Sequence, residues 1–587
     1  MKTFGRSVWL LPAVGLASLA WFLLRVIPKP SRAAYPCQRV AAPLAGSFLL
    51  WLGGIVMTAV AFRHAKRLSR QSRRIAAGLM AAIALVAGIL AIAHTPQEPL
   101  NAAAMLAPAP IGIARGVSPG RVVWVHEPAA TDWAGPGNGH WWEDSHTKQI
   151  FVDNMLSAAV RTLAGQATDA AAWDALIRHF NQTHGKGDVG YTPGEKICIK
   201  VNLVGCIASG GSVDPVTYNL VGQLDYMNTS PQVMRALLRQ LVNAVGVNPA
   251  DISIGDPTAL FPNQYYNLLY SEFPTVRYLD RNGGNDAHPR TAVNLSTVPF
   301  YWSPRPTGKT QDYVPAPYAE AAYLINVANL KSHTAGGVTV CGKNHFGSLK
   351  RYPATSGYFS MHDSLPQFSS ASGRYRCIVD LMGHDHVGGK TLAWFIDGLY
   401  AGVHPIESSP RRWNTAPFNG DWTSSLFASQ DPVAIDSVAF DFLYNEWTDY
   451  PRMAGTDDYL HEAALASGPP SGTFYDPNHP FATTRLASLG VHEHWNNATY
   501  RQYSRNLGTG DGIELIPLRV GGDFDQDGDA DMADFTLFQL CFNGPNRSPN
   551  TYCAVDADFD DDGDVDLVDF GAFQACFNGP NRPPSCL

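Results

Sequence analysis

The hydrophobic pattern divides the chain into an apolar start, a long alternating middle and a polar, repetitive tail. Three apolar runs, at 8–24, 41–62 and 75–93, each approach or exceed the ~20 residues that span the hydrocarbon core of a bilayer. No polar face interrupts them, as it would in helices packed on a water-soluble core. Residues 1–94 are therefore predicted to form a membrane anchor of three transmembrane helices.

The loop between the second and third runs sets the expected orientation. Residues 63–74 hold six lysine or arginine side chains in twelve positions. Such a cluster favours the cytoplasmic side of a membrane. If all three runs span the cell membrane, the N-terminus is cytoplasmic and everything after about residue 94 is extracytoplasmic.

The middle of the chain alternates short β-branched runs with helical stretches. A Pro/Ala-rich linker at 95–120 comes first, and the alternation then occupies 121–517. This pattern is typical of an α/β domain with a largely parallel sheet. The predicted strands are 121–127, 196–204, 251–256, 321–330 and 391–399, and the predicted helices are 147–164, 231–245 and 432–446.

Local signals refine two parts of this prediction. Asp431 followed by Pro432 is the expected opening of the helix at 432–446, because aspartate caps a helix and proline fits its first turn. The Pro/Asn/Trp-rich stretches around 285–320 and 400–425 are expected to be long surface loops.

The tail, 518–587, contains one acidic pattern twice. Asp523 and Asp558 open two loops 35 residues apart, each with carboxylates at positions one, three, five, nine and twelve and glycine at position six. Calcium (Ca2+) is a hard cation that takes six to eight oxygen ligands, and Gly528 and Gly563 permit the tight turn. We therefore expect a small all-α module with two calcium sites. The expected metal-binding residues are Asp523, Asp525, Asp527, Asp529, Asp531 and Asp534 in the first loop, and Asp558, Asp560, Asp562, Asp564, Asp566 and Asp569 in the second.

Charge is spread unevenly along the chain. Residues 1–95 hold twelve basic and no acidic side chains, whereas 521–587 hold fourteen aspartates and two arginines. The middle is mildly acidic and has no basic stripe, so a nucleic acid is not expected as a partner.

Four of the nine cysteines lie at matched places in the tail. We expect disulfides Cys541–Cys553 and Cys576–Cys586, which would stabilise modules too small to fold on an apolar core alone. The other five cysteines show no CxxC spacing, so neither an iron–sulfur site nor a zinc ribbon is supported.

Polar residues follow the predicted strands of the large domain, where open α/β sheets bind ligands. Lys200 and Asn202 end one strand, although an edge lysine in solvent is an equal alternative for Lys200. The densest segment, 329–351, places cations, imidazoles and amides around glycines. Its candidate residues are Lys331, His333, Cys341, Lys343, Asn344 and His345. Backbone amides and cations that converge in this way suit an anionic ligand.

The histidines of this segment leave a metal site open as an alternative. His333 and His345 can bind a transition metal together with residues farther along the chain. The candidates for that supporting role are His362, His384, Asp385 and His386.

Two carboxylates complete the candidate site. Asp397 ends a predicted strand, and Asp436 lies one turn inside the helix opened by Asp431. If both face the crevice, they suit acid–base work or metal binding; a turn and a capped helix are equal alternatives. Asp256, in a Gly-Asp-Pro sequence, is expected only to form a turn. The chain carries no GxSxG, HExxH, Walker loop or GxGxxG in a suitable context.

Several of these segments resemble domain of unknown function family 362 over most of 121–450. The resemblance rests on IKVNLV, SPQVMRALLRQL with DISIGD, NLKSHTAGGVTVCGKNHFG, FIDGLYAG and ASQDPVAIDSVAFDF. Its most specific part is the K-x-H…K-N-x-x-G segment. Many relatives carry a ferredoxin-type cluster module that this chain lacks. The resemblance implies a fold and a binding site, but it does not imply a particular reaction.

The tail resembles a type I dockerin, a pair of EF-hand loops that end in Asp rather than Glu. This resemblance implies a cohesin-like surface protein as partner; a calcium-folded cap that docks nothing is the alternative. Position eight holds Val565 in the second loop and Ala530 in the first, which is therefore expected to pack and bind more weakly.

Two functions remain open from the sequence. In the first, the large domain is an enzyme in which Lys331, His333 and Lys343 bind an anionic or metal-bound substrate, Asp397 and Asp436 do acid–base or metal chemistry, and Lys200, Asn202, Asn344 and His345 bind substrate. In the second, it is a surface binding or assembly component. A pocket containing Lys343 and His333 favours the enzyme, and a shallow aromatic surface favours the binding protein.

Overall fold

The computed structural model describes residues 109–207, 212–351, 356–404 and 409–519, and in the tail 530–545, 557–559 and 564–577 with a few single residues. The chain divides into two units, Met1–Leu106 and Ala107–Leu587. The three apolar runs predicted to cross a membrane lie outside the described residues. Among the helices that are described, none is both long and apolar enough to cross one.

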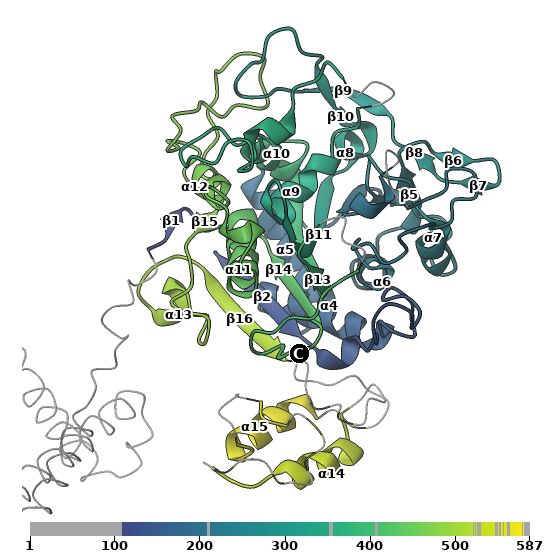
Figure 1. Ribbon diagram of the computed structural model, residues 1–587, viewed down its shortest axis with the longest axis vertical. Coiled ribbons are helices and arrows are strands. Elements are labelled where there is room, and N and C mark those ends of the chain that lie inside the picture. The colour runs from purple at the N-terminus through teal and green to yellow at the C-terminus, as the bar shows by residue number, and fades with distance from the viewer. Residues whose placement is uncertain are drawn as a thin grey trace, which may run out of the picture. The chain divides into compact units, whose positions relative to one another are not determined.

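A ten-stranded sheet forms the centre of the large domain (Figure 1). Its strands run in the order β16-β2-β14-β13-β11-β3-β4-β5-β8, and β12 pairs with β11 outside this path. Within this sheet, β14 and β12 run antiparallel to the rest. The bounds are β2 Arg121–His126, β3 Ile197–Val201, β4 Ile252–Gly255, β5 Arg277–Asp280, β8 Thr291–Ala292, β11 Tyr323–His333, β12 Gly337–Thr339, β13 Thr391–Gly402, β14 Ser425–Ser429 and β16 Glu514–Arg519.

Helices cover both faces of this sheet, because successive residues of its strands are apolar on both sides. Val123 and Val125 pack into a core with one helix group, whereas Val122 and Trp124 pack into a second core with another. The first group is α4 Gln149–Ala164, α5 Asp169–Thr183, α6 Pro231–Arg239 with a π-helical turn Gln240–Val245, and α7 Asn263–Tyr270. The second is α9 Cys341–Asn344, α10 Cys377–Gly383, α11 Pro432–Glu446 and α12 Asp458–Ala464.

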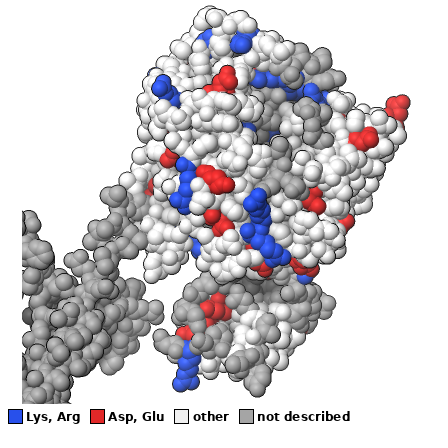
Figure 2. Space-filling view, viewed as in Figure 1, with Lys and Arg blue, Asp and Glu red and all other residues white. Residues whose placement is uncertain are grey.

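Smaller elements complete the domain. They are β1 Ile111–Gly112 with β15 Val491–His492, β6 Gly284–Asn285 with β7 His288–Pro289, β9 Leu295–Phe300 with β10 Asp312–Pro315, α8 Ala316–Glu320 and α13 Ser504–Leu507. On the face shown in Figure 2, lysine and arginine side chains occur singly or beside carboxylates, and no continuous basic track crosses the described residues.

The α/β fold class predicted from the sequence is confirmed. Each of the five predicted strands and three predicted helices is present, and α11 begins at Pro432 with Asp431 accepting hydrogen bonds from the N–H groups of Val433 and Ala434. The prediction of one long loop at 285–320 is wrong, because that stretch forms β7 to β10 and α8. The segment expected as a linker contributes β1, and its Arg115 N–H donates to Asp431 Oδ2 at 2.8 Å.

The tail forms two helices, α14 Met532–Cys541 and α15 Leu567–Cys576, around a small core of its own. Asp531 and Asp566 cap them identically, while Asp534 and Asp569 accept the N–H groups of those caps at 2.8 and 2.7 Å. The predicted Cys541–Cys553 disulfide is confirmed. Cys576 is also disulfide-bonded, and its predicted partner Cys586 lies outside the described residues.

Candidate functional site

The candidate site lies where the parallel strands β3, β4, β5 and β11 end at one edge of the sheet. A cavity of about 300 Å³ opens there. Its polar lining is mainly cationic or amide-bearing and, among the described residues, includes one carboxylate, Asp256. The polar and charged lining residues are Asn202, Asp256, Thr258, Arg281, His333, Thr339, Lys343, Asn344, Lys350, Arg351 and His362. Open α/β sheets bind ligands at this edge, because the chain leaves each parallel strand there.

The glycine-rich segment after β11 carries Lys343 to the cavity. Gly337 has φ of 81°, and an added Cβ there would lie 2.0 Å from Thr456 Cγ2, so the turn between β11 and β12 requires glycine. The chain then enters α9, where Asp436 accepts the N–H groups of Cys341 and Gly342 at 2.8 and 2.9 Å. These two bonds fix the helical turn that presents Lys343.

The ammonium group of Lys343 has little to compensate its burial. The residue is 9% exposed, and Nζ lies 3.8 Å from the centre of the Phe346 ring. Within the described part of the chain it makes no hydrogen bond or ion pair. Burial lowers the pKa of Lys343 to about 8, with a smaller contribution from the nearby charge of Lys200.

His333 presents a hydrogen-bond donor to the same cavity. Its Nδ1 accepts the N–H groups of Ala335 and Gly336 at 2.9 and 3.0 Å, so the neutral ring carries its proton on Nε2. Burial, and then the charge of Lys343, hold the pKa of His333 well below its usual range. The ring is therefore a neutral donor beside a cation.

A buried network connects the ends of β3 and β4 to α9. Lys200 Nζ donates to Asp256 Oδ2 at 2.9 Å and to Asn344 Oδ1 at 3.0 Å. Burial lowers the pKa of Lys200, and the attraction of Asp256 opposes that shift. Asp256 also forms the expected turn by accepting Thr258 N–H at 3.0 Å. The solvated-edge alternative for Lys200 is excluded, because the residue is 1% exposed.

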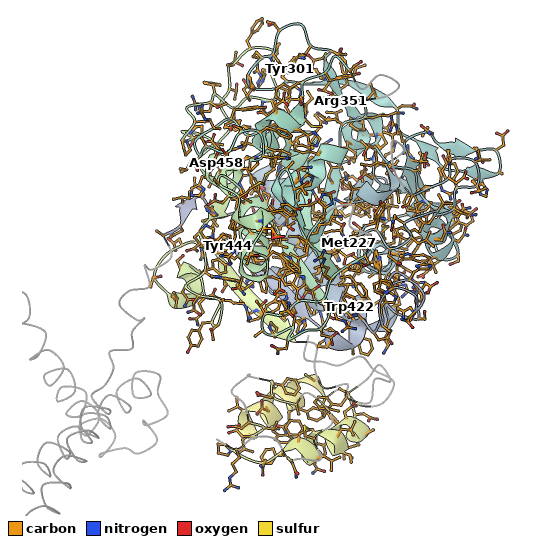
Figure 3. The ribbon with its side chains drawn as sticks, viewed as in Figure 1. Met227, Tyr301, Arg351, Trp422, Tyr444 and Asp458 are labelled. Carbon is orange, nitrogen blue, oxygen red and sulfur yellow. A yellow bond between two sulfur atoms is a disulfide. The ribbon has the colours of Figure 1, made fainter. Side chains whose placement is uncertain are left out.

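Lys331 does not line the cavity but contacts a residue that does. Its Nζ donates to Asn202 Oδ1 at 3.3 Å and to the carbonyl of Met227 (labelled in Figure 3), and Asn202 is the residue that lines the cavity. Burial lowers the pKa of Lys331 to about 7, while Asp397 opposes the shift.

The structure does not bring Asp397 and Asp436 together at the cavity. Asp397 accepts Ser230 N–H at 2.7 Å, at the start of α6, and Leu399 N–H at 3.1 Å. Asp436 is bonded to α9 and to Tyr459 Oη at 3.0 Å. Burial raises the pKa of Asp397 to about 6 and that of Asp436 to about 7. Both carboxylates hold segments of backbone in place, because their oxygens accept hydrogen bonds from N–H and hydroxyl groups.

His345 is also held away from the cavity. Its Nε2 lies 2.9 Å from Asn326 Nδ2 and its Nδ1 lies 2.9 Å from Ser348 Oγ. Burial lowers the pKa of His345 to about 3. Of the nine residues predicted for this site, the cavity is lined by Asn202, His333, Lys343 and Asn344.

The geometry does not gather the expected transition-metal ligands. His362 lines the cavity, but His384 bonds to the Pro299 carbonyl and His386 to Lys390. Throughout the described residues, one group of three or more His, Cys, Asp or Glu has its ligand atoms within 4.8 Å of one another. That group is Asp564, Asp566 and Asp569 of the second loop predicted to bind calcium. Outside the described residues lie Asp523, Asp525, Asp527, Asp529, Asp560 and Asp562.

Sequence reasoning missed several cationic residues of the cavity. Arg281 directly follows β5, a short strand whose sequence RYLD lacks a β-branched run, so no predicted strand end marks this arginine. Lys350 and Arg351 were part of the segment 329–351 but were given no role. Arg351 (labelled in Figure 3) forms an ion pair with Asp312, and Lys350 donates to the Val293 carbonyl at 2.6 Å.

Comparison with known proteins supports the family resemblance over a narrower range than 121–450. No curated protein and no solved structure matches the chain. The matched range, 216–441, includes Lys343, His333, Asp256 and Arg281, and Asn202 precedes it. The central part of the large domain, residues 216–441, matches the family model described as domain of unknown function (DUF362).

Proposed function

We propose that the large domain is an enzyme that binds a small anionic substrate in the cavity at the carboxyl edge of the sheet. The observation that carries this proposal is Lys343, a nearly buried cation that faces the cavity with only an aromatic ring for compensation. Two opposite unit charges about 4 Å apart gain on the order of 4 kcal/mol near a protein surface. A bound carboxylate or phosphate supplies that missing charge.

The same feature favours an enzyme over a receptor. A receptor for anions gains most from a lysine that stays charged, whereas burial brings the pKa of Lys343 to about 8. An amine near that value exchanges a proton, or attacks a carbonyl carbon, at physiological pH. His333 Nε2–H can hold a substrate oxygen beside it. The cavity contains both Lys343 and His333, the arrangement expected of an enzyme.

We further propose that this domain lies on a cell surface. The three apolar runs would anchor the protein in the membrane with the large domain extracytoplasmic, a compartment in which the Cys541–Cys553 disulfide persists. The tail would bind two calcium ions and dock on a cohesin-like surface protein. Support for calcium comes from the clustered carboxylates of the second loop and from the matched caps of the two helices.

Isothermal titration of the full chain with inorganic phosphate, and separately with succinate, tests the anion site. We expect binding by the parent and at least a 10-fold loss in Lys343→Met and in His333→Ala. Lys309→Met, a matched change at an exposed lysine, should bind as the parent does. Parent-like binding by both cavity variants, with unchanged circular dichroism, would show that this site is wrong.

A further inference from the structure

A second cavity, of about 470 Å³, lies between α11, the segment before α12 and the residues after β15. Tyr444 of α11, labelled in Figure 3, is one of its lining residues. Most of the lining follows residue 441, so this cavity lies largely beyond the region that matches the family model. Asp441, Asp457 and His494 are the titratable acids and imidazole on its wall.

Three histidines and one aspartate gather beside this cavity from two pairs of closely spaced residues, and of the four Asp457 and His494 line it. Asp457 and His461 are four residues apart at the start of α12, which places them on one side of the helix. His492 and His494 are two residues apart and point to the same side. Glu493 between them points away and accepts the N–H groups of Ser504 and Ile513. The His492 ring contacts both others, with centroids 4.6 Å from His461 and 4.9 Å from His494.

Each of the three imidazoles uses Nδ1 for a bond to the protein. His494 Nδ1 donates to Asp441 Oδ1 at 2.6 Å, and His461 Nδ1 donates to the Asp457 carbonyl at 3.2 Å. Ser437 Oγ donates to the Val433 carbonyl, so it accepts from His492 Nδ1 at 2.9 Å. A neutral ring in this tautomer leaves a lone pair on Nε2, as His461 and His492 do. His494 differs, because Asp441 and Asp457 outweigh its burial and raise its pKa to about 10, so a metal ion there replaces the proton on its Nε2. Ser437 and Asp441 are themselves four residues apart on α11.

The Nε2 atoms of these three rings are the important feature of the cluster. His492 is 2% exposed, and its Nε2 makes no hydrogen bond to any residue that the structure describes. His494 Nε2 lies 3.9 Å from Asp457 Oδ2, an ion pair at a separation that one shared metal ion could bridge. Metal-bound histidines typically commit the second nitrogen to a carboxylate, carbonyl or hydroxyl in this way, which fixes the ring and the tautomer.

The spacings of the His492 ring from the two other rings are those of rings that share one ion. With zinc–nitrogen bonds of about 2.0–2.1 Å and tetrahedral angles, the centroids of two ligating imidazoles lie roughly 5 Å apart. The set is not fully gathered, because no three of its ligand atoms lie within 4.8 Å of one another. The His494 side chain is 43% exposed, so its ring has room to tilt toward an ion while Nδ1 stays on Asp441.

We propose that Asp457, His461, His492 and His494 form a binding site for a divalent transition metal ion, Zn2+ by the chemistry of three imidazoles and one carboxylate. Ser437 and Asp441 hold two of the rings in position. Asp457 and His494 face the cavity, so a ligand that enters it can reach the ion. This site is separate from the Lys343 cavity, and its failure would leave the anion site untouched.

Titration of the full chain with zinc chloride, in excess Ca2+ to occupy the tail carboxylates, tests the site. We expect the parent to bind one equivalent of Zn2+ more than His494→Ala does. Cobalt(II) should give intense visible bands in the parent that this variant lacks. Ser437→Ala keeps all four ligands and should weaken the affinity ~10–100-fold, as loss of a supporting bond does.

His479→Ala is the matched control, since His479 is a half-exposed histidine paired with Asp476 outside this cluster. It should bind Zn2+ as the parent does. Equal stoichiometry and affinity in the parent, His494→Ala and Asp457→Asn would overturn the proposal. Circular dichroism and thermal unfolding of each variant exclude loss of fold as the cause of any difference.

Discussion

Lys343 differs from the other two buried lysines of the site in what surrounds its ammonium group. Lys200 has the carboxylate of Asp256, and Lys331 has two oxygen acceptors. Lys343 has the face of Phe346. A cation on an aromatic face gains about 1–2 kcal/mol, less than a buried ammonium loses with its water. Burial lowers the pKa of Lys331 to about 7 and that of Lys343 to about 8, but of these two only Lys343 lines the cavity, which makes its amine the reactive one.

The first prediction concerns the pH dependence of that amine. Pyridoxal 5′-phosphate, an anionic aldehyde, should form a Schiff base with Lys343 that borohydride traps. Only the neutral amine attacks, so trapping should rise with pH through about 8 and then level off. An ordinary lysine near 10.4 has on the order of 100-fold less neutral amine at pH 7. Peptide mapping by mass spectrometry gives the yield at each position.

Lys309, on an exposed segment of the same chain, is the internal comparison for this experiment. Equal trapping of Lys343 and Lys309 at pH 7 would contradict the assignment of a lowered pKa in a cationic cavity. His333→Ala should reduce the yield of Lys343 trapping at every pH without moving the pH of half-maximal trapping. That result would show that His333 acts on binding of the aldehyde and not on the reactivity of the amine.

At the scale of elements, buried carboxylates join helices that are distant in sequence. Asp436 connects the second turn of α11 to the start of α9, and Asp397 connects the middle of β13 to the start of α6. The sequence predicts both carboxylates at the site. In the structure neither lines the cavity, and each instead accepts hydrogen bonds from backbone N–H groups. Local sequence predicted that α11 begins at Asp431-Pro432, but which backbone groups Asp436 meets depends on the packing of α9 against α11.

Asp436→Ala should therefore disturb both stability and the site. Removal of the carboxylate leaves two N–H groups and the Tyr459 hydroxyl without their acceptor in a fully buried place. We expect the free energy of unfolding to fall by about 2–4 kcal/mol, measured by urea denaturation. Trapping of Lys343 should fall with it, because α9 loses its anchor.

Asp174→Ala is the matched control for that variant. Asp174 pairs with Arg178 at the surface with 49% of its side chain exposed, so its loss should cost less than about 1 kcal/mol. Similar stability losses in the two variants would contradict the anchoring role of Asp436.

The sequence predicts local elements, but it does not predict contacts between residues that are distant in the chain. Runs of β-branched residues located β2, β3, β4, β11 and β13, since each strand is buried on both faces. The runs SLFAS of β14 and RYLD of β5 contain no β-branched residue and give no such signal. Arg281 was missed with β5. The pairing of Lys200 with Asp256 joins residues 56 positions apart, which no local pattern specifies.

At the scale of the whole molecule, the described residues contain two large apolar cores in the α/β domain and one small core in the tail. The tail core is built from a few phenylalanines between α14 and α15, together with Cys541. So little buried apolar surface does not offset the entropy of ordering the chain unaided. We therefore expect the tail to draw stability from its disulfides and from the calcium ions that we propose it binds.

Calorimetry of the full chain should accordingly show separate transitions for the α/β domain and the tail. Removal of Ca2+ with EGTA should lower the tail transition alone, because carboxylates such as Asp564, Asp566 and Asp569 then repel one another. Cys541→Ser opens a loop of 12 residues and should cost the tail about 3 kcal/mol while leaving the larger transition in place. If EGTA instead lowered the transition of the α/β domain, calcium would be acting on the large cores, and the tail would not be the independent module that its separate core implies.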